Sequence, residues 1–353
     1  MNKPIRFALL GCGRISYRHA ELLYNQIPGA QLVAVCDIAA EKAQKYADKY
    51  NIPCYTDYHE MLKKEDIDVV NILTESGNHA KHALDVLEYG KHIVVEKPMA
   101  LKINDADAMI SKAEDKGLKL FVVKQNRYNY PVRKLRQAID EGRFGKLVLG
   151  TVRVRWCRQQ KYYDEDSWRG TWAMDGGVFT NQASHHIDLL EWMMGDIESV
   201  SAKSATRLVN IETEDTGIAV LRFTNGALGI IEATTAARPK DLEGSISILG
   251  EKGTVEIAGF AVNEMKTWNF QDERADDAEV LSEYKQNPPN VYGFGHSEYL
   301  KAVVDSLHNN TPAPVDGYEG RKSLLLINAL YESIETGKDI KLHFQPEKSR
   351  LGK

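Results

Sequence analysis

The chain has 353 residues, 43% of them hydrophobic, with a formal net charge of −5 and a pI near 6.1. This length predicts two domains, and the acidic balance argues against nucleic acid as the main partner. No apolar run reaches the ~20 residues that span a bilayer, and the polar opening residues are not those of a signal peptide. We therefore expect a cytoplasmic protein without membrane insertion, whose four scattered cysteines are buried free thiols.

The first 125 residues alternate between short apolar, β-branched segments and helical patterns. The segments expected as strands are residues 5–10, 31–36, 69–73, 92–95 and 120–123. The helical patterns cover residues 19–26, 41–50, 78–89 and 104–116, and Gly90 and Gly117 close the last two as C-cap glycines often do. This alternation predicts a first domain over residues 1–125 built on a Rossmann-type, doubly wound parallel sheet.

The pattern changes after residue 125. Longer alternating segments indicate half-buried strands at residues 147–156, 199–207, 217–223, 228–235, 244–249 and 253–257. Helices are expected at residues 132–141, 185–194, 296–308 and 319–335, and a polar surface excursion at residues 270–290. We predict a second, α+β domain over residues 126–353 with a large open, mainly antiparallel sheet, its late helices packing back on the first domain. A free sheet face of this breadth predicts a homodimer or homotetramer.

A glycine-rich turn, Gly11-Cys12-Gly13, lies between the first strand and the first helix. Such a turn brings a pyrophosphate to a helix N-terminus, and Ser16 stands where the motif has its third glycine. Asp37 ends the second strand, where a carboxylate accepts hydrogen bonds from the adenosine ribose and repels a 2′-phosphate. The pattern favours NAD over NADP, although Arg14 lies within reach of a phosphate and Asp37 also fits a solvated helix cap.

A lysine stands directly after the apolar strand at residues 92–95, in the run Glu96-Lys97-Pro98. This position is the carboxyl edge of the predicted sheet, where open α/β folds bind ligands. Pro98 biases Lys97 toward an extended backbone and helps to fix its direction. By itself Lys97 fits an ordinary surface lysine better, and the glycine-rich turn upstream reverses that preference.

A second group of polar residues lies between residues 175 and 188. Asn181 and His185 are four residues apart and share a face if the segment is helical. His185 is a candidate proton relay, whereas His186 is expected to be a hydrogen-bonded core residue. Adjacent histidines point apart on a helix and no third ligand has metal-like spacing, so no metal site is expected.

Arginine and tyrosine side chains gather between residues 153 and 169. Both residue types pair well with carboxylates and phosphates. We favour a binding role for Arg158, Tyr163 and Arg169. Arg153 and Arg155 fit a solvated sheet face equally well.

Over nearly its whole length the chain resembles the Gfo/Idh/MocA family of NAD(P)-dependent sugar oxidoreductases. The residues that carry the resemblance are Gly11, Gly13, Arg14, Ile15, His19, Asp37, residues 74–79, Glu96, Lys97, Pro98, Trp168, Arg169, Gly176, Gly177, His185 and Asp188. The resemblance implies an NAD site made by Gly11, Gly13, Arg14, Ile15, Asp37, Thr74, Asn78, His79, Glu96, Lys97, Gln125, Trp168 and Arg169. It implies a substrate site made by Lys97, Arg158, Tyr163, Asn181, Gln182 and His185.

Members of this family typically use the lysine of the Glu-Lys-Pro motif with an Asp and a His of the second domain. Lys97 and His185 match, but Asn181 replaces the Asp; it can orient a hydroxyl but cannot take its proton. Base duty then falls on Lys97 or His185, and all three count as catalytic candidates.

With Asn181 in this position, the chain resembles the branch of the family that oxidises the C3 hydroxyl of UDP-N-acetyl-D-glucosaminuronate for lipopolysaccharide sugars. Some members of that branch recycle NADH with 2-oxoglutarate. An inositol or free-sugar dehydrogenase of the same family, and a non-catalytic NAD-binding sensor, are the alternatives.

Overall fold

The computed structural model describes residues 3–283 and 295–353. The chain forms two compact units, one made of Met1–Lys124 with His296–Arg321 and the other of Gln125–Gly295 with Lys322–Lys353. A late segment, which the sequence analysis placed in the second domain, therefore belongs to the first unit. The expected boundary at residue 125 stays a prediction.

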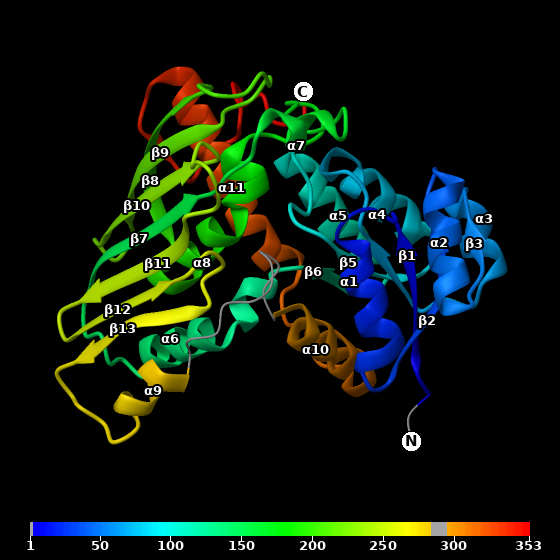
Figure 1. Cartoon of the computed structure of the whole chain (residues 1–353), viewed down its shortest axis with the longest axis horizontal. Helices are drawn as coiled ribbons and strands as arrows, with labels where there is room; N and C mark the ends of the chain where they lie inside the picture. The colour runs from blue at the N-terminus through cyan, green and yellow to red at the C-terminus, as the bar shows by residue number, and fades with distance from the viewer. Residues whose placement is uncertain (1–2, 284–294) are drawn as a thin grey trace. The chain divides into compact units, whose positions relative to one another are not determined.

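The first unit contains a six-stranded parallel sheet in the order β3-β2-β1-β4-β5-β6, which confirms the predicted Rossmann arrangement (Figure 1). The strands are β1 (Ile5–Leu10), β2 (Ala30–Cys36), β3 (Cys54–Tyr55), β4 (Val69–Ile72), β5 (His92–Val95) and β6 (Leu120–Val122). The helices are α1 (Ser16–Glu21), α2 (Ala40–Tyr50), α3 (Tyr58–Lys64), α4 (His79–Glu88), α5 (Ile103–Asp115) and α10 (Gly295–Asn309). All four residues of β4 are buried, as expected of a strand covered on both faces.

The second unit contains an eight-stranded sheet in the order β13-β12-β11-β7-β10-β9-β8-β14. The strands are β7 (Leu147–Arg155), β8 (Ile197–Ala205), β9 (Thr216–Phe223), β10 (Leu228–Thr234), β11 (Glu243–Gly250), β12 (Gly253–Ala258), β13 (Glu264–Phe270) and β14 (Ile340–Lys341). Neighbours run antiparallel except β7 and β10, which pair in parallel. The prediction of a mainly antiparallel sheet is confirmed, although the sequence analysis missed β13 and β14.

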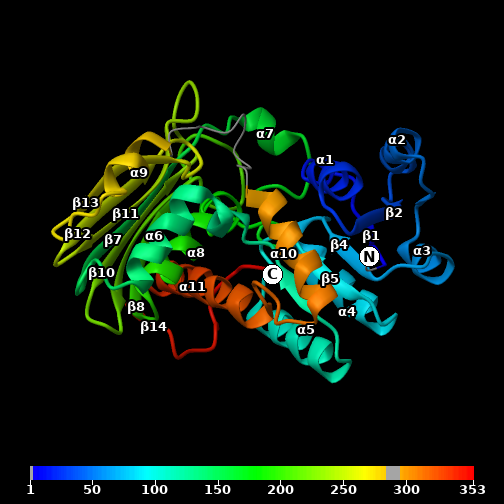
Figure 2. The same ribbon diagram turned by 90° about the horizontal axis from the view of Figure 1, so that it is seen from below.

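Helices cover one face of this second sheet (Figures 1 and 2). They are α6 (Tyr130–Asp140), α8 (Ser184–Met194) and α11 (Gly317–Thr336). Gly150 of β7 lets α8 approach closely, because a Cβ there would lie 2.7 Å from side-chain atoms of Leu190 and Met194. On the opposite face, alternate residues of β9 and β10 are exposed, including Ile218, Val220 and Ile230.

Several local expectations differ from the structure. The helix expected at residues 19–26 ends its regular α-helical part at Glu21 and continues as a π-helix, Leu22–Gln26. The expected excursion at residues 270–290 contains the short helix α9 (Asp277–Glu283), and its last part lies outside the described residues. All four cysteines are free, but Cys54 and Cys157 are only half-buried. Among the helices of the described residues, none has the length and hydropathy needed to cross a bilayer.

Candidate active site

The glycine-rich turn after β1 places two glycines in different surroundings. Gly11 has a φ of +102°, and a Cβ there would lie 2.8 Å from the backbone of Leu73, so the fold itself requires glycine. A Cβ on Gly13 would meet nothing within 4 Å, so the protein leaves open space above this position. Ser16 donates from Oγ to the Gly13 carbonyl at 2.6 Å, which explains how serine serves in place of the third glycine.

Asp37 ties this turn to the end of β2. One carboxylate oxygen accepts the Cys12 N–H at 2.7 Å, and the other accepts the Ala39 N–H at 2.8 Å. The second bond goes to Ala39, the residue just before α2, and no side chain caps that helix. Each oxygen keeps a lone pair for a ribose hydroxyl, and the predicted cofactor residues Arg14 and Ile15 follow directly in the chain.

The predicted cofactor residues after β4 make contacts within the protein. Asn78 donates to Glu75 Oε2 at 3.2 Å, and Thr74 Oγ1 lies 2.9 Å from Nδ1 of His82. The buried His79 places Nδ1 2.7 Å from the Pro98 carbonyl oxygen and Nε2 3.0 Å from that of Thr74. Burial lowers the pKa of His79, although both carbonyls favour its protonated form.

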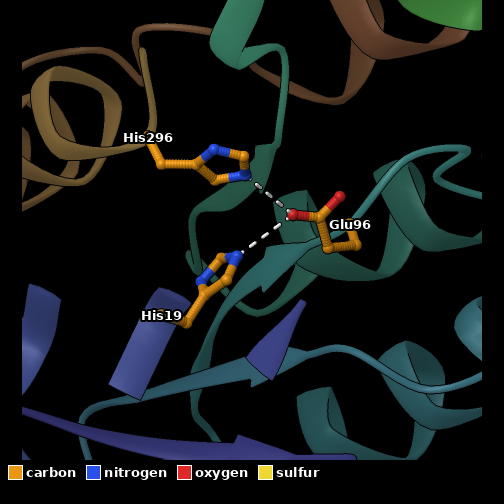
Figure 3. Close-up of side chains that lie close together, drawn as sticks. All are labelled: His19, Glu96 and His296. Carbon is orange, nitrogen blue, oxygen red and sulfur yellow. Dashed lines mark hydrogen bonds and ion pairs between the residues drawn. The ribbon is translucent and has the colours of Figure 1, made fainter. Parts of the chain in front are cut away.

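Glu96 and Lys97 follow β5, and two side chains, His19 of α1 and His296 of α10, converge on Glu96 (Figure 3). Glu96 Oε1 lies 3.0 Å from Nε2 of His19 and 3.5 Å from Nε2 of His296, while Oε2 accepts the Lys97 N–H at 3.1 Å. Burial alone would raise the pKa of Glu96, but hydrogen bonds with the two imidazoles hold it well below its ordinary value. The sequence analysis listed Glu96 as a cofactor contact; here both its oxygens face protein partners.

In the second unit, Asn181 and His185 do not belong to one regular α-helix. Asn181 lies in a π-helix, Val178–Gln182, and His185 lies in the first turn of α8. Asn181 donates its amide N–H to Oδ1 of the buried Asp175, whose other oxygen accepts the Gly170 N–H at 2.8 Å. The protein therefore holds the nitrogen end of the Asn181 amide.

The Gln125 amide nitrogen lies 2.9 Å from Nε2 of His185. If that nitrogen is the donor, the neutral His185 ring carries its proton on Nδ1. Gln182 is buried, and its side-chain nitrogen has no hydrogen-bond partner among the described residues.

Two other residues of α8 are structural. His186 is fully buried with its ring edge against Trp156, and burial lowers its pKa to about 4. Asp188 accepts two hydrogen bonds of 2.9 Å from the guanidinium of Arg127. Both side chains pack in the interior of the second unit.

Another buried carboxyl group, Glu214, which sequence reasoning missed, supports the π-helix that carries Asn181. Glu214 Oε1 accepts the Phe179 N–H at 3.1 Å and the Tyr331 hydroxyl at 2.9 Å. The same hydroxyl accepts the Gly177 N–H at 3.1 Å. Burial raises the pKa of Glu214 to about 7 despite these bonds.

The predicted arginine and tyrosine contacts gather around α7 (Gln160–Asp164). Arg158 donates to Asp241 at 2.9 Å, and Arg169 donates to Asp166 at 3.0 Å while its guanidinium lies 4.6 Å from the Trp168 ring centre. The Tyr163 hydroxyl lies 3.2 Å from Thr235 Oγ1, and burial raises its pKa to about 12.

Arg153 and Arg155 form ion pairs with Glu232 and Glu243 of the neighbouring strands. These pairs match the alternative of a solvated sheet face.

A parallel sheet with a glycine-rich turn after β1 and a lysine at the carboxyl edge of β5, followed by an open-sheet unit, defines a two-domain dinucleotide-dependent oxidoreductase. The family model described as "Oxidoreductase family, NAD-binding Rossmann fold" matches residues 5–124, and "Oxidoreductase family, C-terminal alpha/beta domain" matches residues 136–342. The chain belongs to the Gfo/Idh/MocA oxidoreductase family, which confirms the resemblance found in the sequence.

Two solved structures are similar over nearly the whole chain. The WlbA dehydrogenase from Bordetella pertussis, in complex with NADH and UDP-GlcNAcA, is 42% identical with a TM-score of 0.92, covering 97% of this chain and 98% of that one. The WlbA dehydrogenase from Chromobacterium violaceum, in complex with the same two ligands, is 41% identical with a TM-score of 0.91, covering 97% and 96%.

Among curated proteins, the myo-inositol 2-dehydrogenase of Thermotoga maritima is 29% identical, covering 96% of this chain and 98% of that protein. Together these comparisons show an NAD-dependent sugar dehydrogenase.

Proposed function

We propose that this chain oxidises the C3 hydroxyl of UDP-N-acetyl-D-glucosaminuronate to the 3-keto sugar, as a step in making lipopolysaccharide sugars. The observation that carries the proposal is the 41–42% identity to two dehydrogenases crystallised with NADH and UDP-GlcNAcA, against 29% to an inositol dehydrogenase. The arginines around α7 suit the carboxylate and diphosphate of such a substrate.

The residues present fit a bound dinucleotide. The open space above Gly13 leaves room for a pyrophosphate at the start of α1, and Asp37 retains lone pairs for the adenosine ribose. We assign the turn contacts to Gly11, Gly13 and Arg14. NAD, when bound, supplies the hydride acceptor for the oxidation.

Of the two candidate bases, Lys97 and His185, one takes the hydroxyl proton. As the C3 hydrogen leaves as a hydride, the C3 hydroxyl gives its proton to a base and the C–O single bond becomes a carbonyl. With the Gln125 amide donating to Nε2 of His185, the lone pair of the neutral ring is already engaged. We therefore assign the base to Lys97, and we give His185 and Asn181 the task of orienting the hydroxyl.

The test is to incubate the pure protein with NAD and UDP-N-acetyl-D-glucosaminuronate, with and without 2-oxoglutarate, and to measure the sugar product by mass spectrometry. The proposal predicts a product lighter by two hydrogens. Product that forms beyond one turnover only with 2-oxoglutarate supports recycling of bound NADH. No product under either condition contradicts the substrate assignment.

A second candidate, oxidation of an inositol or a free sugar, is favoured by the full-length similarity to the myo-inositol 2-dehydrogenase. The same assay with myo-inositol and unactivated sugars separates the two candidates. Oxidation of polyols without oxidation of the UDP-sugar would favour the second candidate. The presence of Lys97 and His185 argues against a third, a non-catalytic NAD-binding sensor.

We also propose that the open face of the second sheet binds a second copy of the chain. Ile218, Val220 and Ile230 form an exposed apolar strip on β9 and β10. The strip is bordered by the ion pair of Arg155 with Glu232, so the face carries both charge signs beside its apolar residues. Val220→Lys should shift the mass measured by light scattering toward the monomer; a wild-type monomer would contradict this part of the proposal.

A further inference from the structure

We propose that His19 and His79 are positioning residues that hold the backbone of Lys97 from both sides, His19 through Glu96 and His79 through the carbonyl of Pro98. The inference rests on the proposed function, in which Lys97 meets the sugar hydroxyl. Both histidines are buried within the first unit.

On the first side, a hydrogen-bonded chain leads from β4 to Lys97. The Asn71 amide nitrogen lies 2.9 Å from Nδ1 of His19, and Nε2 of His19 lies 3.0 Å from Glu96 Oε1. Because an amide nitrogen only donates, Nδ1 is the acceptor, and the proton of the neutral ring sits on Nε2. His19 therefore donates to the carboxylate, and burial, which lowers the pKa of the ring, favours this neutral form.

Glu96 passes this constraint on to the lysine. Its Oε1 faces the imidazoles of His19 and His296, and its Oε2 accepts the Lys97 N–H at 3.1 Å. Each oxygen of the carboxylate thus faces a separate partner, so the group is not free to rotate. A carboxylate held in this way fixes the peptide plane at the start of Lys97.

On the second side, His79 lies between the segments that follow two adjacent strands. Its Nδ1 lies 2.7 Å from the Pro98 carbonyl, after β5, and its Nε2 lies 3.0 Å from the Thr74 carbonyl, after β4. Both carbonyls only accept and a neutral ring has one N–H, so the shorter distance assigns the hydrogen bond to Pro98 and the Thr74 contact is not a second one. Lys97 therefore lies between Glu96 and Pro98, and each of these two residues contacts a buried imidazole.

This arrangement matters because catalysis by a lysine depends on where its amine is placed. A displacement of about 1 Å in a reacting group costs up to ~10²-fold in rate. Lys97 has a long side chain, so the position of its amine depends on how firmly the backbone at its root is held. The buried imidazoles supply that constraint without themselves contacting the substrate.

A metal ion is the competing explanation for part of this cluster. His19, Glu96 and His296 place one ligand atom each within 4.8 Å of one another, a grouping that also suits a metal ion (Figure 3). In the tautomer inferred from the Asn71 contact, Nε2 of His19 carries a proton, which a metal ion would have to displace. Metal analysis of the pure protein decides between the two explanations.

The test compares His19→Leu and His79→Leu with His92→Leu. His92 is half-buried at the start of β5 and accepts the Lys119 N–H at 3.0 Å, so the control removes a partly buried histidine contact at the other end of that strand. Amide hydrogen exchange of the peptide covering residues 94–101 is measured without substrate. We expect exchange at least ~10-fold faster in the first two variants and unchanged in His92→Leu. Exchange that stays at the wild-type rate in both would overturn the proposal.

Steady-state kinetics test whether the two histidines act through Lys97. We expect kcat to fall at least ~10-fold in His19→Leu and His79→Leu, with the Kd for NADH within about threefold of wild type. In a Lys97→Met background, His19→Leu should cost nothing further, since its target is already gone. Losses that add fully to that of Lys97→Met would overturn the proposal.

Two further measurements cover a His19 variant that does not fold and a bound metal ion. If His19→Leu does not fold, His19→Gln, which keeps an N–H donor, replaces it and should exchange at a rate between wild type and His79→Leu. One equivalent of bound metal in the wild type, lost on substitution of His19, would overturn the hydrogen-bonded chain. The exchange measurement needs no substrate, so it decides the inference even if the UDP-sugar assignment fails.

Discussion

Two buried glutamates, one in each unit, have pKa values shifted in opposite directions from the ordinary value. Glu96 and Glu214 are both buried, and each accepts a backbone N–H, from Lys97 and from Phe179 respectively. Hydrogen bonds with two imidazoles hold the pKa of Glu96 well below its ordinary value against the effect of burial. Glu214 has a tyrosine hydroxyl instead, and burial raises its pKa to about 7.

The difference teaches that burial alone does not set the charge of a carboxyl group, because its hydrogen-bond partners decide whether the effect of burial prevails. It also shows a shared function, since each glutamate holds the backbone beside a candidate catalytic residue, Lys97 in one unit and Asn181 in the other. Glu96, whose pKa is held low, supports a segment directly after a strand, whereas Glu214, whose pKa burial raises to about 7, supports a π-helix.

The largest effect should come from removing the residues that the two glutamates support. Lys97→Met should lower kcat by at least ~10²-fold with NADH affinity unchanged, because the base is lost. Asn181→Ala should cost only about tenfold, since an amide orients the hydroxyl but takes no proton. Steady-state kinetics and NADH titration measure both; near-normal turnover by Lys97→Met would refute its role as the base.

The next effect concerns stability and should separate the two glutamates. Glu96→Gln replaces an ionised acceptor and should destabilise the protein by about 3 kcal/mol, because charge-assisted hydrogen bonds are lost. That loss corresponds to a Tm lower by roughly 6 °C or more. Thermal unfolding followed by circular dichroism gives the value. An unchanged Tm would mean that Glu96 is neutral in the folded protein.

The pH dependence should have opposite signs at the two sites. For Glu214 the folded pKa of about 7 exceeds the ordinary 4.5, so its stabilising protonation is complete below pH 4.5 and is lost as pH rises through 7. Relative to wild type, Glu214→Gln should therefore gain roughly 3 kcal/mol between pH 5 and pH 8. Glu96 has a depressed pKa, so its contribution is present above pH 4.5 and is lost as pH falls.

Denaturant unfolding of wild type and both variants at several pH values measures these differences. A stability difference between Glu214→Gln and wild type that does not change with pH would contradict the assigned state of Glu214.

The smallest effect tests how tightly Glu214 packs. A Cβ on Gly177 would lie 2.1 Å from Glu214 Oε2, so Gly177→Ala should destabilise the protein by about 2 kcal/mol. Gly13→Ala is the matched control, because a Cβ there meets nothing within 4 Å and should leave Tm unchanged. Equal Tm values for Gly177→Ala and wild type would mean that Glu214 does not pack as described.

The sequence predicts most of the first unit because its signals are local. The β-branched strands, the glycine turn and the Glu-Lys-Pro run each lie within a few residues, and the parallel sheet follows from their alternation. The contact between His296 and Glu96 joins residues 200 positions apart, so no local pattern could reveal it. The role of Asn71 was not predicted for a different reason: it is a single polar residue within an apolar strand.

The second unit was harder to predict in detail. The four-residue spacing of Asn181 and His185 suggests an α-helix. The backbone hydrogen bond from the Ala183 N–H to the Val178 carbonyl shows instead that residues 178–182 form a π-helix. Glu214 and Tyr331 come from distant parts of the chain, and their sequence neighbours give no sign that they meet. The strand β13 was missed because its pairing with β12 contains an irregularity near Ile257, which disturbs the alternation.

The most direct test of the central claim follows the C3 hydrogen itself. UDP-N-acetyl-D-glucosaminuronate deuterated at C3 is mixed with the NAD-loaded wild type and with the Lys97→Met variant, and the nicotinamide and sugar are analysed by mass spectrometry. We predict that the wild type transfers deuterium to the reduced nicotinamide and forms a 3-keto sugar, while Lys97→Met transfers almost none. A reduced nicotinamide without deuterium, or equal transfer by the variant, would contradict the account.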